Sequence, residues 1–196
     1  MERIVGMKAP SFNMATALGD GSGFGRVSLD DYKGKWLVLF FYPLDFTFVC
    51  PTEITGYSKK YDAFKGMDAE VLGVSIDSEH SHKAWINSDL GKLNFPLAAD
   101  LTKKVASDYG VLIEEEGIAL RGLFIIDPQG VVRYSVVHDL NVGRSVDETL
   151  RVFKALQKGG LCPVDRSEGE DILYDKIAVF QQKLCIPTFM RFIAFY

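Results

Sequence analysis

Cysteine is scarce in this chain, and so are signals for export. Only three of the 196 residues are cysteine, so the chain does not have the dense disulfide framework of small secreted domains. Its first six residues contain no apolar stretch of the kind that a secretory signal requires. We therefore expect a cytoplasmic protein in which each cysteine is a candidate for redox or nucleophilic chemistry.

Long hydrophobic runs and basic charge are lacking as well. The longest apolar run near the middle of the chain, residues 36–42, is far shorter than the roughly 20 residues that cross a bilayer. The net charge is −4 and the pI is about 5.4, so no basic field is available to attract phosphate. We expect neither a membrane nor a nucleic acid as partner.

What the sequence does contain is a series of strand and helix patterns. The run Trp36–Tyr42 is apolar, aromatic and β-branched and is ended by Pro43, which predicts a central strand covered on both faces. A helical pattern from Thr52 to Phe64 follows, and then a second strand at 70–76. The remaining predicted elements are two helices, a hairpin and a last helix, at 83–90, 103–109, 122–137 and 145–157.

The order of these elements predicts the fold class. Right-handed crossovers place the first strands side by side and parallel, and the hairpin around Asp127–Gly130 adds antiparallel strands on the other side. We therefore predict an α/β fold with a mixed central sheet and helices on both faces. Because the composition changes from Gly159 onward, we predict a core domain over 1–158 and a C-terminal extension over 159–196.

Cys50 lies where the first strand leads into the first helix. Pro51 suits the first helical position, so the sulfur is expected at the positive end of the helix dipole, which favours a thiolate. A helix terminus contributes only about 0.3–1 kcal/mol, whereas each unit of lowered thiol pKa requires about 1.4 kcal/mol. A cation is therefore needed, but residues 36–57 contain no Arg or Lys. Arg121, at the start of a predicted core strand, is the best-placed candidate.

Two neighbours of Cys50 extend this hypothesis. Thr47 carries a hydroxyl that could hydrogen-bond the sulfur or an oxygen of a bound substrate, and Pro43 would wall the site with a rigid ring. The competing interpretation is structural, since a lone cysteine at a helix start is more often a small buried apolar residue than a nucleophile. Spacing alone leaves both interpretations open.

The segment 41–53, F-Y-P-L-D-F-T-F-V-C-P-T-E, closely resembles the active-site signature of typical two-cysteine peroxiredoxins. Its kernel is Pro-x-x-x-Thr-x-x-Cys, at Pro43, Thr47 and Cys50. The resemblance covers roughly residues 3–164 and includes further matching segments at 77–85, 109–111, 119–127 and 142–148. It implies a thioredoxin-like fold and a peroxidase that needs neither a metal nor an organic cofactor.

The resemblance also implies a role for each matched residue. Cys50 would be the peroxidatic cysteine that attacks hydrogen peroxide or an organic hydroperoxide and becomes a sulfenic acid. Thr47 would polarise the peroxide, Arg121 would stabilise the thiolate and the transition state, and Pro43 would shield the sulfur from water. Two further residues match family positions that brace the arginine: Glu53 and Arg144.

Cys162, in the segment 159–163, matches the resolving cysteine of the family. The resemblance implies that it condenses with the sulfenic acid of a partner subunit, which makes an antiparallel homodimer the catalytic unit. It also implies rings of five dimers, and recycling of both thiols by thioredoxin or a flavin-dependent disulfide reductase.

The chain departs from the family pattern in two places. Residues 88–91 read Ser-Asp-Leu-Gly where over-oxidation-sensitive relatives have Gly-Gly-Leu-Gly, and Val164 begins a sequence that replaces the usual Asn-Trp. The tail 183–196 matches no family segment. We interpret its Cys185 as an ordinary thiol, and we expect the tail to pack on a neighbour and not in a bilayer.

Three histidines and two alternative function classes also bear on the interpretation of the chain. His80, His82 and His138 form no convincing metal-ligand set with the cysteines, and we interpret them as surface or interface residues. General thiol–disulfide exchange on proteins usually needs Cys-x-x-Cys, and Glu53 at the fourth position argues against it. A holdase activity of a ring assembly remains an alternative second function.

Overall fold

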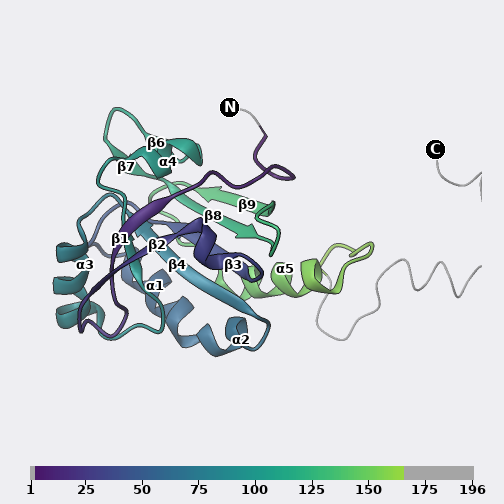
Figure 1. Ribbon diagram of the computed structural model, residues 1–196, viewed down its shortest axis with the longest axis horizontal. Helices are drawn as coiled ribbons and strands as arrows, with labels where there is room; N and C mark the ends of the chain where they lie inside the picture. The colour runs from purple at the N-terminus through teal and green to yellow at the C-terminus, as the bar shows by residue number, and fades with distance from the viewer. Residues whose placement is uncertain (1–2, 166–196) are drawn as a thin grey trace, which may run out of the picture. The chain divides into compact units, whose positions relative to one another are not determined.

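The computed structural model describes residues 3–165, which divide into two compact units with the boundary after Val146. The first unit contains a seven-stranded mixed sheet in the order β2-β1-β5-β4-β3-β8-β9 (Figure 1). Its strands are β1 Asn13–Ala17, β2 Phe24–Ser28, β3 Trp36–Phe41, β4 Ala69–Ser75, β5 Leu97–Ala99, β8 Arg121–Ile126 and β9 Val132–His138. A separate small hairpin joins β6 Leu112–Ile113 to β7 Ile118–Ala119.

The helices of this unit are α1 Cys50–Lys59, α2 Tyr61–Lys65, α3 Glu79–Trp85 and α4 Lys104–Asp108. Two short helical turns accompany them, a 3-10 turn at Leu29–Tyr32 and a wider turn at Ile86–Leu90. Helix α5, Val146–Lys158, belongs almost entirely to the second unit. No described helix is both long and apolar enough to cross a membrane.

Strand β3 is the centre of the fold. It pairs in parallel with β4 and antiparallel with β8, so that Leu39 lies opposite Leu72 on one side and Phe124 on the other. The side chains of residues 37–41 are completely inaccessible to solvent. The predicted central strand, its parallel neighbour and the antiparallel hairpin beyond it are therefore confirmed.

Apolar side chains of β3 point alternately to the two faces of the sheet. On one face, Phe41 contacts Tyr109, with 5.4 Å between ring centroids, just beyond α4. On the other face, Phe40 stacks on Tyr57 of α1 at 4.8 Å. Figure 1 accordingly shows α1 and α2 on one side of the sheet and α4 with the β6–β7 hairpin on the other. The predicted helices on both faces are confirmed.

Two predicted helices have different limits in the structure. The helix predicted over 52–64 begins at Cys50 and is divided at Lys60, where φ is −98° and ψ is 5°. The helix predicted over 83–90 begins earlier, because the Ser78 hydroxyl accepts a hydrogen bond from the backbone N–H of Ser81 at 3.1 Å and caps the first turn.

Strands β1, β2 and β5 were not predicted. Both β1 and β5 are rich in alanine, which has little intrinsic preference for strands. They are strands because of tertiary pairing: β5 pairs with β4, and β1 pairs with β5 and β2.

The C-terminal predictions are only partly within the described residues. The tail 183–196 and Cys185 lie outside them, and the division into 1–158 and 159–196 stays a prediction.

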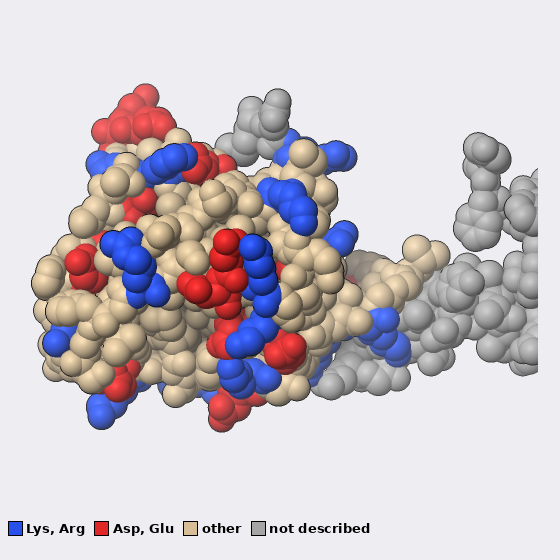
Figure 2. Space-filling model, in the orientation of Figure 1, with Lys and Arg blue, Asp and Glu red and all other residues tan. Residues whose placement is uncertain are grey.

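On the face of the molecule in Figure 2, basic and acidic side chains are interspersed.

Candidate active site

Cys50 is the first residue of α1, at the end of the loop that follows β3. Its side chain is fully buried and its thiol is free. Pro51 occupies the first turn, and the Val49 carbonyl accepts the backbone N–H of Thr52 at 3.1 Å, so the helix begins as the sequence predicts. The sulfur therefore lies at the carboxyl edge of the central strand and at the amino end of a helix.

The Arg121 side chain joins Cys50 to a carboxylate. Its Nη1 lies 3.4 Å from the Cys50 sulfur and donates to Glu53 Oε2 at 2.6 Å, while its Nε donates to the Leu140 carbonyl at 2.7 Å. Nη1 has two hydrogens and can serve the sulfur and the carboxylate together. Arg121 is 2% exposed, so the cation faces the thiol in a buried site.

Glu53 is the anion that organises two arginines. Its Oε1 accepts from the backbone N–H and the Nε of Arg144, each at 2.7 Å, and its Oε2 accepts from Arg144 Nη2 at 3.1 Å and from Arg121. Burial by itself would raise the pKa of Glu53, but the hydrogen bonds and charge of Arg144, followed by the charge of Arg121, hold that pKa below its ordinary value. Glu53 is therefore ionised.

The buried group carries a charge imbalance. Two guanidinium groups, Arg121 and Arg144, surround the single carboxylate of Glu53, which leaves one positive charge in excess. An anionic sulfur at Cys50 would neutralise it. Since uncompensated buried charge is costly, the arrangement can stabilise a thiolate at Cys50.

Backbone carbonyls hold the two arginines in place. Leu140 accepts from Arg121, and Gly122 accepts from Arg144 Nη1. Arg144 also lies 5.4 Å from the centre of the Phe40 ring, in cation–π distance. Sequence reasoning missed both carbonyls, because a backbone acceptor has no residue-type signal.

Pro43 and Thr47 lie in the loop between β3 and α1. Pro43 is buried and Thr47 is half-buried. The Thr47 hydroxyl donates to the Leu44 carbonyl at 3.0 Å, which engages its proton and leaves its oxygen as an acceptor. Pro43 and Thr47 thus lie seven and three residues before Cys50 in sequence, and the Thr47–Leu44 hydrogen bond closes the turn 44–47.

The prediction that His82 is a surface or interface residue is wrong. Its side chain is 0% exposed, because it lies on the inner side of α3, where Nδ1 is 2.8 Å from a carboxylate oxygen of Asp45. By contrast, the side chain of His80 is 75% exposed, and His138 is half-buried. Asp45 itself was not singled out from the sequence, although it lies within the signature segment.

Cys162 lies in the second unit and has different surroundings. Its thiol is free and exposed. It borders an open pocket of about 300 Å³ within that unit, whose other lining residues are Arg151, Val152, Ala155, Leu156, Gly159, Gly160 and Pro163. The thiol is accessible to a reactant from outside.

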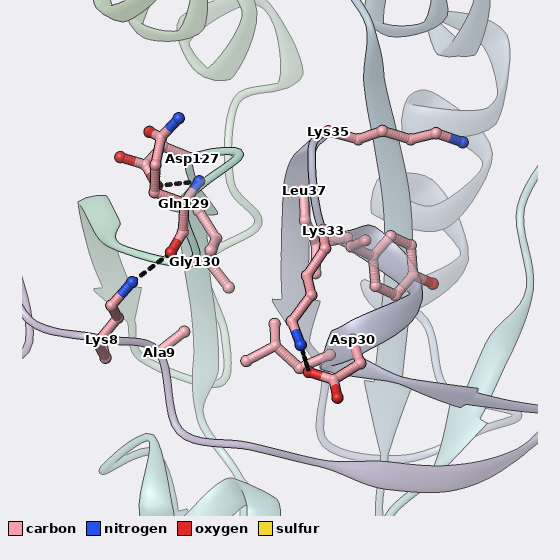
Figure 3. A pocket seen from close by; sticks show the side chains of 12 residues that line it. Lys8, Ala9, Asp30, Lys33, Lys35, Leu37, Asp127, Gln129 and Gly130 are labelled. Carbon is pink, nitrogen blue, oxygen red and sulfur yellow. Dashed lines mark hydrogen bonds and ion pairs between the residues drawn. The ribbon is translucent and has the colours of Figure 1, made fainter.

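Two further features bear on ligand binding. Within residues 3–165, no group of three or more His, Cys, Asp or Glu side chains is placed to hold a metal ion. A cavity of about 160 Å³ lies at the start of β3, beside Leu37, at the end of the strand away from Cys50 (Figure 3). Each of its three lining lysines has a partner: Lys8 donates to the Gln129 carbonyl, Lys33 pairs with Asp30 at 3.0 Å and Lys35 pairs with Glu70 at 3.3 Å.

The fold is a mixed sheet whose central strand leads into a helix with a buried cysteine at its amino end, and a buried arginine faces that cysteine. This combination defines a thiol-based oxidoreductase of thioredoxin-like fold. The AhpC/TSA family profile matches residues 5–135. The chain is 66% identical over 178 residues to a Clostridium pasteurianum protein of the rubredoxin operon that is described as a peroxiredoxin. This match covers 88% of this chain and 100% of the relative. It is 55% identical over 178 residues to bovine peroxiredoxin-2, with 86% and 88% covered.

The fold comparison agrees with the sequence comparison. The reduced 2-Cys peroxiredoxin of Plasmodium vivax matches with a TM-score of 0.83 at 39% identity, over 87% of this chain and 92% of that one. The chain therefore belongs to the AhpC/TSA family and is a peroxiredoxin, a peroxidase of the oxidoreductase class. The resemblance, the thioredoxin-like fold and the enzyme class expected from the sequence are confirmed.

Proposed function

We propose that this peroxiredoxin reduces hydrogen peroxide and organic hydroperoxides through Cys50. The Cys50 thiolate attacks one peroxide oxygen, an S–O bond forms and the O–O bond breaks. The leaving oxygen takes a proton and departs as water or an alcohol, and the sulfur, now oxidised by two electrons, is a sulfenic acid. The observation that carries this proposal is the contact of Arg121 with both Cys50 and Glu53.

Arg121 serves two steps of this reaction. Before attack, its charge favours the thiolate, since the buried group has one positive charge in excess. During attack, negative charge moves from the sulfur to the leaving oxygen, and a buried guanidinium stabilises that charge strongly. Glu53 and Arg144 act as positioning residues that fix the direction of Arg121.

Thr47 and Pro43 handle the substrate in this proposal. The Thr47 hydroxyl donates to Leu44, so its oxygen can accept a hydrogen bond from a peroxide O–H and orient the O–O bond. Pro43 is buried at the end of β3 and supplies an apolar wall. The buried sulfur favours a small peroxide over a protein disulfide, which argues against general thiol–disulfide exchange.

Resolution of the sulfenic acid falls to Cys162 of a second copy of the chain. Its thiol attacks the Cys50 sulfur, a disulfide forms and water is released. Because the Cα atoms of a disulfide lie within about 7 Å and Cys50 is buried, the first turn of α1 must open locally before the bond forms. The exposure of Cys162 supports its role.

We further propose that the protein is a homodimer and that five dimers assemble into a ring. Thioredoxin or a flavin-dependent disulfide reductase returns the disulfide to two thiols.

The test of the peroxidatic role is peroxide consumption with a thioredoxin system. Cys50→Ser should abolish it without changing the circular dichroism spectrum, because serine keeps the volume and removes the nucleophile. Turnover above about a tenth of the wild-type rate would exclude Cys50 as the attacking residue, since loss of the nucleophile costs several orders of magnitude.

The test of the resolving role uses non-reducing gels. Peroxide treatment of the reduced protein should give a covalent dimer, and Cys162→Ser should prevent it while the first oxidation of Cys50 keeps its rate. Cys185→Ser is the control and should form the dimer normally. A covalent dimer that persists in Cys162→Ser would transfer the resolving role to another cysteine.

A further inference from the structure

The loop between β3 and α1 has a conformation that its own sequence does not favour. Phe46 has a φ of +54°, a left-handed conformation that is unfavourable for residues other than glycine. The turn 44–47 is closed by the single hydrogen bond from the Thr47 hydroxyl to the Leu44 carbonyl. A strained turn of this kind persists only when contacts from outside it hold it.

Asp45 supplies these contacts. Its side chain is 2% exposed and accepts two hydrogen bonds, from Tyr42 Oη at 2.9 Å and from Ser81 Oγ at 2.7 Å. A carboxylate oxygen of Asp45 also lies 2.8 Å from His82 Nδ1. Its backbone N–H donates to Asp77 Oδ2 at 2.8 Å. One residue of the turn is thus tied to the end of β3, to α3 and to the segment after β4.

His82 extends the anchor to the sheet. Its second ring nitrogen, Nε2, lies 3.2 Å from the Ala98 carbonyl of β5, so the imidazole bridges the turn and a strand. Three residues further along α3, Trp85 packs against the Phe46 ring at 5.6 Å. Burial, followed by the charge of Asp45, raises the pKa of Tyr42 well above its ordinary value, which keeps the phenol a donor to Asp45.

This anchor is distinct from the arginine group. Among the described contacts of Asp45 and His82, none involves Arg121, Glu53 or Cys50. The arginine group faces the thiol itself, whereas the Asp45 group holds the turn that carries Thr47.

We propose that Asp45 and His82 are positioning residues for peroxide reduction, whose buried pair fixes the turn 44–47 and thereby places Thr47 for the peroxide. This inference rests on the proposed roles of Cys50 and Thr47. It can be tested separately from them, because it assigns Asp45 and His82 to orientation of the substrate and not to formation of the Cys50 thiolate.

The experiment measures two rates on each variant. His82→Gln retains a donor for one partner but cannot bridge two, and Asp45→Asn retains the backbone N–H contact. In both variants the second-order rate constant for hydrogen peroxide should fall about 10–100-fold, the loss that a misplacement of about 1 Å produces. The pH profile of Cys50 alkylation by iodoacetamide should stay that of the wild type. His80→Gln, the exposed histidine two residues away, is the matched control and should change neither rate.

Each outcome decides the proposal. A folded His82→Gln with the wild-type peroxide rate overturns it. An alkylation profile that shifts together with the peroxide rate also overturns it, because the pair would then act through the thiolate. If His82→Gln does not fold, Ser81→Ala removes a single donor from Asp45 and should lower the peroxide rate alone, and an unchanged rate overturns the proposal. Peroxide consumption by Cys50→Ser would instead refute the proposed function.

Discussion

The two described cysteines each have an Arg–Glu pair in their neighbourhood, and the two pairs differ in burial. Beside Cys50, the side chains of Arg121 and Glu53 are 3% and 1% exposed and joined at 2.6 Å. In the second unit, Arg151 and Glu148 are joined at the same distance, but their side chains are 33% and 46% exposed. Arg151 lines the pocket that Cys162 borders.

This difference in burial changes what the same chemical groups can do. Two unit charges 4 Å apart interact by about 1 kcal/mol in water and about 4 kcal/mol at the effective dielectric of a protein site. The buried pair can therefore bias the charge of its cysteine, whereas the exposed pair is screened. An attacking cysteine needs the first environment. A resolving cysteine needs access, which the second provides.

The largest expected effect is on stability, when the buried carboxylate is neutralised. Glu53→Gln leaves Arg121 and Arg144 without their anion, and breaking a buried pair in this way costs about 3–5 kcal/mol. Urea unfolding at pH 7 measures the loss. Glu148→Gln is the matched control in the exposed pair and should cost less than about 1 kcal/mol. Equal losses in the two variants would contradict the role assigned to burial.

The comparison of the wild-type protein with Glu53→Gln also has a pH signature. The pKa of Glu53 in the folded state is below its ordinary value of 4.5, so its contribution to stability is present above that value. The contribution is lost as the pH falls through the lower folded-state pKa. Wild-type protein should therefore lose more stability than Glu53→Gln as the pH falls below about 4.5. Parallel curves for the two proteins would show that Glu53 is not ionised in the fold.

The next effect is on catalysis, when the buried cation is removed. Arg121→Ala should lower the peroxide rate constant about 10²–10³-fold, the usual loss for a donor that stabilises charge in a transition state. Alkylation of Cys50 should slow at neutral pH, with its pH profile moved to higher pH. Arg121→Lys should restore only part of the rate, because lysine lacks the planar fork that serves Cys50, Glu53 and Leu140 together. An alkylation profile unchanged in Arg121→Ala would sink the thiolate role.

Residue types with local patterns were predictable, and partners without residue-type signals were not. The signature segment and the helix-start proline located Cys50, and the absence of nearby basic residues led to Arg121, 71 residues away in sequence. The carbonyls of Leu140 and Gly122 could not be predicted, because every residue carries one. Strand β5 is only three residues long, and it exists through its pairing with β4 and β1. His82 was misassigned because a helix pattern does not reveal which polar residue meets a buried carboxylate.

The smallest expected effect concerns Arg151. Its pKa is raised, first by the hydrogen bond from its guanidinium to Glu148 and in smaller part by the charges of Glu148 and Cys162. Because the guanidinium of Arg151 is exposed, solvent should screen its charge. Arg151→Gln should therefore change the rate of Cys162 alkylation by no more than about threefold, which is the size of effect that exposed ion pairs produce. The measurement is alkylation in the Cys50→Ser/Cys185→Ser background, where Cys162 is the single remaining cysteine.

Salt sharpens this last prediction. At about 1 M ionic strength the Debye length is roughly 3 Å, so the small difference between Arg151→Gln and the parent should disappear. The corresponding difference for Arg121→Ala at Cys50, measured in the Cys162→Ser/Cys185→Ser background, should persist, because buried charges are screened much less than exposed ones. A tenfold or larger effect of Arg151→Gln on the alkylation rate that persists at high salt would contradict the distinction between the buried and the exposed Arg–Glu pair. It would mean that Cys162, like Cys50, is activated by its own cation.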